Sequence, residues 1–201
     1  MRALCSVFLL CCSLLALPAA SATVGTPAPD FSLPDANGRS VRLSDFRGRH
    51  VVLEWTNPGC PFVQKHYRSG NMQALQREAA AAGVVWLTIN STEPGHGDYL
   101  PPAQLARWTG EQRARPTATL LDEDGRVGRA YGARVTPHMY LIDPQGRLLY
   151  VGGIDSIPSA RVEDIGPATN FVRLGLQEAL AGRSLSRPTT PPYGCSIKYA
   201  P

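Results

Sequence analysis

The chain has 201 residues, of which 43% are hydrophobic, and a formal net charge of +4. This length and composition suit one globular domain with a leader and a tail, and they exclude a long disordered chain. Arginines and lysines stand singly among acidic and apolar residues, without a basic stripe interleaved with aromatics, so the sequence does not predict nucleic-acid binding.

The N-terminal segment has the layout of a secretory leader. An apolar run over residues 3–17 follows a basic residue, and the small residues Ala20-Ser21-Ala22 come after a proline. The run is shorter than the roughly 20 apolar residues that span a membrane. We expect a signal peptide over residues 1–22, cleavage after Ala22, and a secreted or periplasmic protein without stable membrane insertion.

Loss of this leader would leave two of the five cysteines, Cys60 and Cys195. In an oxidising compartment such a pair is either a structural disulfide or a redox pair. Neither cysteine has a partner at the spacing of a zinc site, so we expect no metal and no other cofactor.

The first half of the mature chain predicts a strand, a helix and a second strand. Asn37-Gly38 is typical of a hairpin turn, and Pro61 suits the first position of a helix because its missing N–H costs nothing there. The predicted elements are an extended arm over Thr23–Leu33, a strand at Val41–Leu43, a buried strand at Val51–Trp55, one helix over Pro61–Ala82 and a strand at Val84–Ile89.

The second half predicts a connecting helix, a hairpin and a final helix that Gly182 can cap. Together the two halves predict an α/β fold with a central mixed β-sheet flanked by helices, in a domain over residues 23–182. A Pro-rich tail over residues 183–201 carries Cys195. The elements are helices at Ala103–Gln112, Val127–Tyr131 and Phe171–Leu180, and strands at Thr117–Leu121, Met139–Ile142 and Leu148–Val151.

Cys60 lies at the junction of a predicted strand and helix, directly before Pro61. A thiolate at a helix start faces unpaired N–H groups and the positive end of the helix dipole, which lower its pKa and make it nucleophilic. Lys65 and His66 could add positive charge nearby. The alternative is a small buried core residue.

Segments along the chain resemble the thioredoxin superfamily. Val51–Val63 is similar to the active-site strand and helix start of that superfamily, and Asp30–Leu33 with Leu43–Gly48 resembles the entry of the redoxin and AhpC/TSA-type peroxiredoxins. The string Tyr193–Lys198 resembles a peroxiredoxin-like subgroup with a single active-site cysteine. The resemblance runs from about Val24 to the tail, and it implies a thioredoxin-like fold with an N-terminal extension.

The active-site pattern departs from both parent families. Cys60 matches the first cysteine of the thioredoxin Cys-x-x-Cys motif, but Val63 stands in place of the second. In peroxiredoxins, the peroxidatic cysteine matches the position of Val63 and a threonine that of Cys60. Exchange between two thiols within the motif is therefore impossible.

The resemblance implies roles for residues away from Cys60. Glu54 matches a buried carboxylate that acts as a proton shuttle; the alternative is a strand residue that points to solvent. Thr136-Pro137 matches a cis proline beside the reactive cysteine, where a substrate peptide can pair with the strand edge, and Pro61 borders the same place. His138 follows this proline and is expected to pack against the sheet.

Cys195 is interpreted either as a resolving thiol, which attacks the mixed disulfide on Cys60, or as half of a permanent disulfide. The leading hypothesis is an exported thiol–disulfide oxidoreductase whose partners are protein or small-molecule disulfides and thiols and an unidentified electron donor. Two alternatives are an atypical peroxiredoxin-like thiol peroxidase and a non-catalytic module that binds copper or a partner protein.

Overall fold

The structure is a computed structural model that describes residues 22–201. The predicted signal peptide covers residues 1–22. Residues 1–21 lie outside the described residues, so the structure describes only its last residue, Ala22. Between residues 22 and 201, the structure contains no helix that is both long and apolar enough to cross a membrane.

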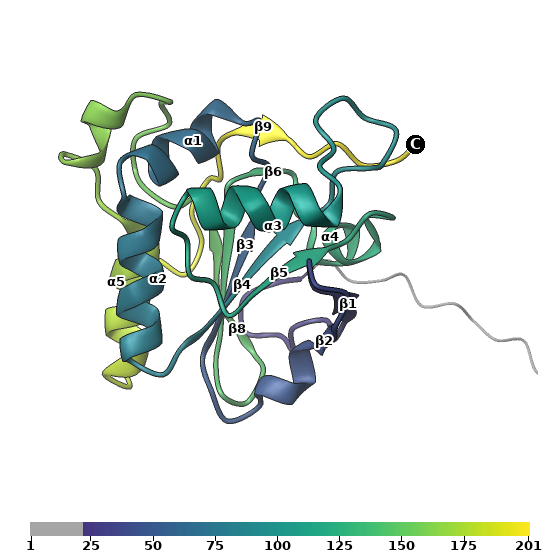
Figure 1. Cartoon of the computed structure of the whole chain (residues 1–201). Coiled ribbons are helices and arrows are strands. Elements are labelled where there is room, and N and C mark those ends of the chain that lie inside the picture. Colours follow the sequence, from purple (N-terminus) through teal and green to yellow (C-terminus); the bar gives the residue numbers. More distant parts are fainter. Residues whose placement is uncertain (1–21) are drawn as a thin grey trace, which may run out of the picture.

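A five-stranded mixed sheet forms the centre of the domain (Figure 1). Strands β3, β4 and β5 are parallel, whereas β7 runs antiparallel to β3 and pairs with β8 at the edge. This arrangement confirms the predicted α/β fold with a mixed sheet. The sheet order is β5 (Ala118–Leu121), β4 (Val85–Asn90), β3 (Val51–Trp55), β7 (His138–Ile142) and β8 (Leu148–Gly152).

Alternate residues of the central strand β3 enter two separate cores. Leu53 and Trp55 face the core on one side of the sheet, whereas Val52 faces the core on the other side. Both faces are covered, so every residue of β3 and β4 is buried. Glu54 therefore points to the same side as Val52, because successive side chains of a strand alternate.

Helices cover the side of the sheet that Val52 faces. Met72, Leu75 and Phe171 belong to the core on this side, and Trp108 packs against it. Figure 1 shows α2 and α5 side by side on this face, with α1 above them. The helices are α1 (Pro61–Arg68), α2 (Asn71–Ala81), α3 (Pro102–Glu111) and α5 (Phe171–Leu180).

The expectation of one helix over residues 61–82 is wrong. The chain forms α1 and α2 as separate helices, with Gly70 between them in the left-handed conformation at φ 75°. Glycine adopts this conformation without the Cβ clash that other residues suffer, so the chain can leave α1 and begin α2 at this position.

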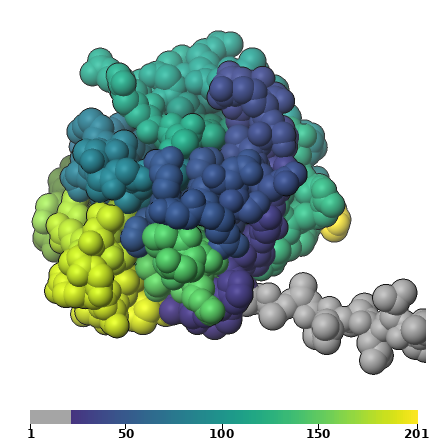
Figure 2. Space-filling view, turned by 90° about the horizontal axis from the view of Figure 1, so that it is seen from below, coloured from purple at the N-terminus to yellow at the C-terminus, as the bar shows by residue number. Residues whose placement is uncertain are grey.

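The opposite side of the sheet is covered by the N-terminal extension and α4 (Arg126–Tyr131). Strands β1 (Ser32–Pro34) and β2 (Ser40–Arg42) form the predicted hairpin, and a 3₁₀ helix, η1 (Leu43–Phe46), follows. Figure 2 views the end of the molecule away from α1, where this early segment lies beside the turn between β7 and β8. The backbone N–H of Ala28 donates to the carbonyl of Gly146 there.

The tail runs back along the domain instead of leaving it. Along the chain, β8 is followed by the 3₁₀ helix η2 (Val162–Ile165), by α5 and then by the tail. In the tail, Thr189 forms a β-bridge with Val151 of the edge strand β8. The two-residue strand β9 (Cys195–Ser196) then pairs antiparallel with β6 (Val135–Thr136). The tail therefore passes α1 at β9 and runs on to the C-terminus, where Ala200 accepts a hydrogen bond from Arg129 of α4 (Figure 1).

Candidate active site

Cys60 is the N-cap residue of α1, at the end of the turn that follows β3. Its backbone is extended (φ −77°, ψ 122°), and Pro61 occupies the first helical turn. The turn is held by the N–H of Cys60, which donates to the carbonyl of Asn57 at 3.0 Å. The Cys60 sulfur therefore lies at the positive end of α1, as the sequence predicts.

Cys60 and Cys195 form a disulfide across 135 residues of sequence, with their Cα atoms 5.9 Å apart. Cys60 is buried, with 3% of its surface exposed. Its Sγ also lies 3.2 Å from the backbone carbonyl oxygen of Thr136, which can accept a hydrogen bond from the thiol form. Cys60, Cys195 and Thr136 thus meet at one place.

Thr136-Pro137 is a cis peptide bond, as the resemblance implies. The strand edge before this proline belongs to β6, and it is paired with β9 of the tail, where Thr136 lies opposite Cys195. The contact is close: a Cβ on Gly194, which has φ 144°, would overlap the carbonyl oxygen of Thr136. The tail of the chain itself occupies the edge that the sequence assigns to a substrate peptide.

Glu54 is fully buried, so its interpretation as a solvent-facing strand residue is wrong. Its carboxylate accepts hydrogen bonds from Tyr67 Oη and Trp86 Nε1, each at 2.8 Å, and from Thr88 Oγ1 at 3.2 Å. Burial raises the pKa of Glu54, and these hydrogen bonds oppose that rise. Tyr67 belongs to α1, the helix that begins after Cys60, and it shares the same core as Cys60.

Lys65 and His66 do not form the positively charged surroundings expected for Cys60. Lys65 Nζ lies 3.3 Å from an Asp155 carboxylate oxygen, and both side chains are buried. Burial lowers the pKa of His66 to about 4, with Asp155 raising it and Lys65 lowering it further. His66 is therefore neutral at pH 7, and the charge of Lys65 is paired with Asp155.

The buried neutral His66 should make the protein less stable in acid. The pKa of His66 is about 4 in the folded chain, against 6.5 as the ordinary value, so below pH 6.5 the unfolded chain binds a proton that the folded chain does not. The stability from this group is complete above pH 6.5 and is lost as the pH falls to 4, by about 3 kcal/mol. Urea unfolding of wild type and His66→Gln between pH 7 and pH 4 measures the difference in slope.

The matched control is His96→Gln, because the His96 side chain is 37% exposed. This variant is measured over the same pH range and reports the effect of replacing an exposed histidine. If His66→Gln lost stability on acidification as steeply as wild type, the assignment of a neutral buried imidazole to position 66 would be incorrect.

The sequence indicated no role for two residues of this region, Asp155 and Tyr193. Asp155 follows β8, and Tyr193 lies two residues before Cys195; the tyrosine hydroxyl donates to the Asp155 carboxylate.

His138 packs against Tyr140, as expected, with ring centroids 4.7 Å apart. Within residues 22–201, no group of three His, Cys, Asp or Glu side chains gathers as metal ligands would.

The chain is similar to proteins of known thiol chemistry. Thiol-disulfide oxidoreductase ResA of Bacillus subtilis (strain 168) is 25% identical over 138 residues, which cover 65% of this chain and 68% of ResA. Peroxiredoxin Bcp of Escherichia coli (strain K12) is 34% identical over 112 residues, which cover 54% of this chain and 63% of Bcp. The matched region therefore spans about two thirds of the length of these relatives.

A solved structure matches almost the whole chain. An uncharacterised conserved protein from Geobacillus kaustophilus superposes with a TM-score of 0.79 and 28% identity, covering 93% of this chain and 99% of its own. The sequence model of the AhpC/TSA family matches residues 24–151, which include all of the central sheet but Gly152, together with Cys60 and the cis proline. The chain belongs to the AhpC/TSA family of the thioredoxin superfamily.

Proposed function

We propose that this protein is an exported thiol–disulfide oxidoreductase in which Cys60 attacks and Cys195 resolves. The observation that carries the proposal is the Cys60–Cys195 disulfide at the start of α1, beside the cis proline. ResA and Bcp support an oxidoreductase, and the leader pattern supports export with residues 23–182 as the folded domain.

The exchange reaction needs the reduced pair. The Cys60 thiolate attacks one sulfur of a substrate disulfide, so a mixed disulfide forms and the other substrate sulfur leaves as a thiolate. The Cys195 thiolate then attacks Cys60 Sγ, which releases the second substrate thiolate and closes the Cys60–Cys195 disulfide. The substrate gains two electrons and the cysteine pair loses them, and a thiol donor must reduce the pair before the next cycle.

The neighbouring residues are proposed to support these steps. Glu54 accepts and returns the proton of an attacking thiol, because burial brings its pKa towards the range useful for proton transfer. Thr136, Pro137 and Pro61 border the strand edge on which a substrate peptide would lie once the tail has moved. The buried hydroxyl of Thr136 has no hydrogen-bond partner among the described residues, which leaves it free to bind such a peptide.

Membership of the AhpC/TSA family and the similarity to Bcp favour a second candidate, a thiol peroxidase. In that reaction the Cys60 thiolate attacks a peroxide oxygen, the O–O bond breaks, and Cys60 becomes a sulfenic acid. Cys195 would then displace water and close the same disulfide. Both candidates therefore end in the oxidised pair and differ in the oxidant.

One comparison separates the two candidates. Reduced protein is mixed with a disulfide substrate such as insulin or with hydrogen peroxide, and closure of the Cys60–Cys195 disulfide is followed by mass spectrometry. We expect faster closure with the disulfide, because Val63 stands where peroxiredoxins carry their peroxidatic cysteine. Cys60→Ser is the control for background oxidation. Faster closure with peroxide would favour the peroxidase, and closure with neither would favour a non-catalytic binding module.

A further inference from the structure

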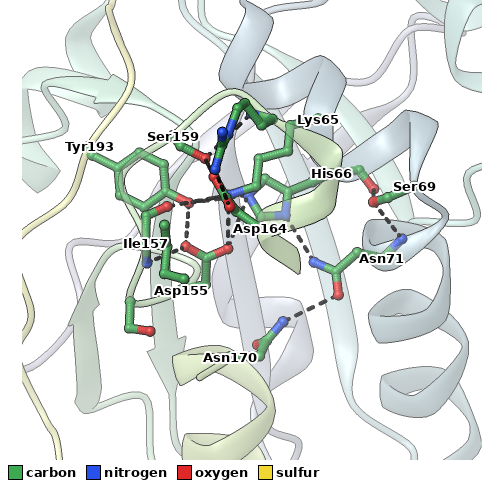
Figure 3. Close-up of polar contacts among 12 residues, drawn as sticks. Lys65, His66, Ser69, Asn71, Asp155, Ile157, Ser159, Asp164, Asn170 and Tyr193 are labelled. Atoms are coloured by element: carbon green, nitrogen blue, oxygen red, sulfur yellow. Dashed lines mark hydrogen bonds and ion pairs between the residues drawn. The ribbon is translucent and has the colours of Figure 1, made fainter. Parts of the chain in front are cut away.

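A buried cluster of charged and polar side chains lies between α1, Asp155 and the tail (Figure 3). Lys65 and His66 point from α1 towards the carboxylate of Asp155, and the phenol of Tyr193 enters from the tail. The side chains of Lys65 and His66 are 0% exposed and that of Asp155 is 3% exposed. The tail thus contributes a half-buried tyrosine to a cluster whose other three side chains are buried.

The hydroxyl of Tyr193 both donates and accepts in this cluster. It donates to Asp155 Oδ1, and it lies 3.5 Å from Lys65 Nζ and 3.3 Å from His66 Nε2. Lysine can only donate, so the phenol oxygen accepts from Lys65.

The tautomer of His66 also makes the phenol oxygen of Tyr193 a hydrogen-bond acceptor. Its Nδ1 lies 2.9 Å from the Asn71 amide nitrogen, which can only donate, so Nδ1 is the unprotonated ring nitrogen. The orientation of that amide is supported by Asn170 Nδ2, which donates to Asn71 Oδ1 at 3.4 Å. A neutral His66 therefore carries its hydrogen on Nε2, and this N–H donates a hydrogen bond to the Tyr193 hydroxyl.

A phenol is the group that completes this cluster. A phenylalanine ring at position 193 would keep the edge-on contact with Phe62, whose centroid lies 5.8 Å from that of Tyr193. It would leave His66 Nε2 without its acceptor, and an unpaired buried polar group is costly. Asp155 would also lose its hydroxyl donor and keep only Lys65 and the N–H of Ile157. The pocket thus favours a tyrosine of the tail over an apolar side chain of the same shape.

We propose that Tyr193 is a positioning residue: Lys65, His66 and Asp155 bind its phenol and so hold the tail over Cys60 whether or not the disulfide is closed. Tyr193 precedes Cys195 by two residues, so the Cα atoms of the two residues are at most about 7 Å apart. An anchor this close keeps the reduced Cys195 thiol within reach of Cys60. The inference rests on the proposed function, in which Cys195 resolves the mixed disulfide.

Further bonds hold the tail on both sides of the anchor. Thr190 Oγ1 accepts from the N–H of Gly153 at 3.1 Å, and the N–H of Ile197 donates to the carbonyl of Arg134 at 3.0 Å. These bonds do not involve the sulfur atoms, so opening the disulfide does not by itself remove them. A tail that stays docked also covers Cys60, and reagents reach that thiol only while the tail is released.

The test is the labelling rate of Cys60 in the full chain with Cys195→Ser, which has no disulfide and keeps every tail contact described above. Iodoacetamide is the probe, and rates are followed against pH so that the thiolate fraction is separated from access. Adding Tyr193→Phe should raise the rate about 10- to 100-fold, because hydrogen bonds to charged groups are lost and labelling follows the released fraction when reclosing is fast.

Tyr199→Phe in the same background is the matched control. Tyr199 is also a tail tyrosine, but its hydroxyl donates to a neutral group, the Ala133 carbonyl, at 2.9 Å. Its removal should raise the labelling rate less than about tenfold. Thermal unfolding of each variant is measured alongside, because a merely structural tyrosine would lower the melting temperature without faster labelling of the folded protein.

The proposal is overturned if Tyr193→Phe labels no faster than Tyr199→Phe, or only as fast as its global unfolding allows. The readout requires no substrate, so it is separate from the proposed function. Faster labelling in a protein that exchanges no disulfides would keep the anchored tail and remove the oxidoreductase. Disulfide exchange by the protein without faster labelling of Tyr193→Phe would support the oxidoreductase and contradict the anchoring role of Tyr193.

Discussion

Replacing Cys60 with serine is expected to abolish disulfide exchange, whereas replacing Cys195 with serine should trap substrates. A serine hydroxyl stays protonated near neutral pH and is a poor nucleophile, so Cys60→Ser cannot form the mixed disulfide. Cys195→Ser still carries the attacking thiol but lacks the group that releases the product. Mixed disulfides with substrate should therefore accumulate in Cys195→Ser alone, and non-reducing electrophoresis of the protein after incubation with a disulfide substrate shows them as heavier bands.

A permanent disulfide predicts a different pair of results. Both variants would open the same loop of 135 residues, lose a similar stability of about 5 kcal/mol in the chain-entropy model, and trap nothing. Urea unfolding of the two variants supplies this comparison. Wild-type exchange by Cys195→Ser without trapped species would mean that a thiol from another molecule resolves Cys60.

Glu54→Gln is expected to slow disulfide exchange by about 100-fold at neutral pH, within the range that acid–base groups contribute. The amide keeps the shape of the carboxyl group but cannot accept the proton of an attacking thiol. Because burial raises the pKa of Glu54 above 4.5, the wild-type rate should rise with pH through that raised value. Stopped-flow measurement of exchange against pH should show this rise in wild type and its absence in Glu54→Gln.

Asp122→Asn is the matched control for this variant. Asp122 is also a buried carboxylate whose pKa is raised by burial, and it accepts hydrogen bonds from Ser91, Val127 and Gly128 rather than from α1. Its replacement should leave the exchange rate and its pH dependence unchanged. A Glu54→Gln enzyme that retained the wild-type pH profile would reduce Glu54 to a structural acceptor for Tyr67 and Trp86.

The stability of Glu54→Gln gives an independent check. A carboxyl group whose pKa is raised on folding stabilises the folded chain less as the pH rises through that raised pKa, because the unfolded chain loses its proton earlier. Glu54→Gln lacks this dependence. The variant should therefore lose less unfolding free energy than wild type between pH 4.5 and neutral pH, provided that the amide is accommodated by the same three donors.

The regular elements could be predicted from local patterns, because strand and helix formation depends on neighbouring residues. The apolar run of β3 (Val51–Trp55) and the helix α5 (Phe171–Leu180) lie where the sequence places them. The break between α1 and α2 was missed, since the apolar and alanine-rich pattern continues through Gly70 and only its left-handed backbone interrupts the helix. A glycine within a long helical pattern was the available signal.

The sequence by itself determined the thiol at a strand-to-helix junction, because Cys60, Pro61 and the preceding turn are adjacent in the chain. It also indicated Glu54 and Thr136-Pro137 through resemblance. Only the tertiary structure decided that Cys195 reaches Cys60 across 135 residues and that the tail pairs with β6. The same is true of Asp155 and Tyr193, which join Lys65 in one buried cluster. Such contacts depend on how the sheet and helices pack, and local sequence preferences carry no information about which distant segments the packing brings together.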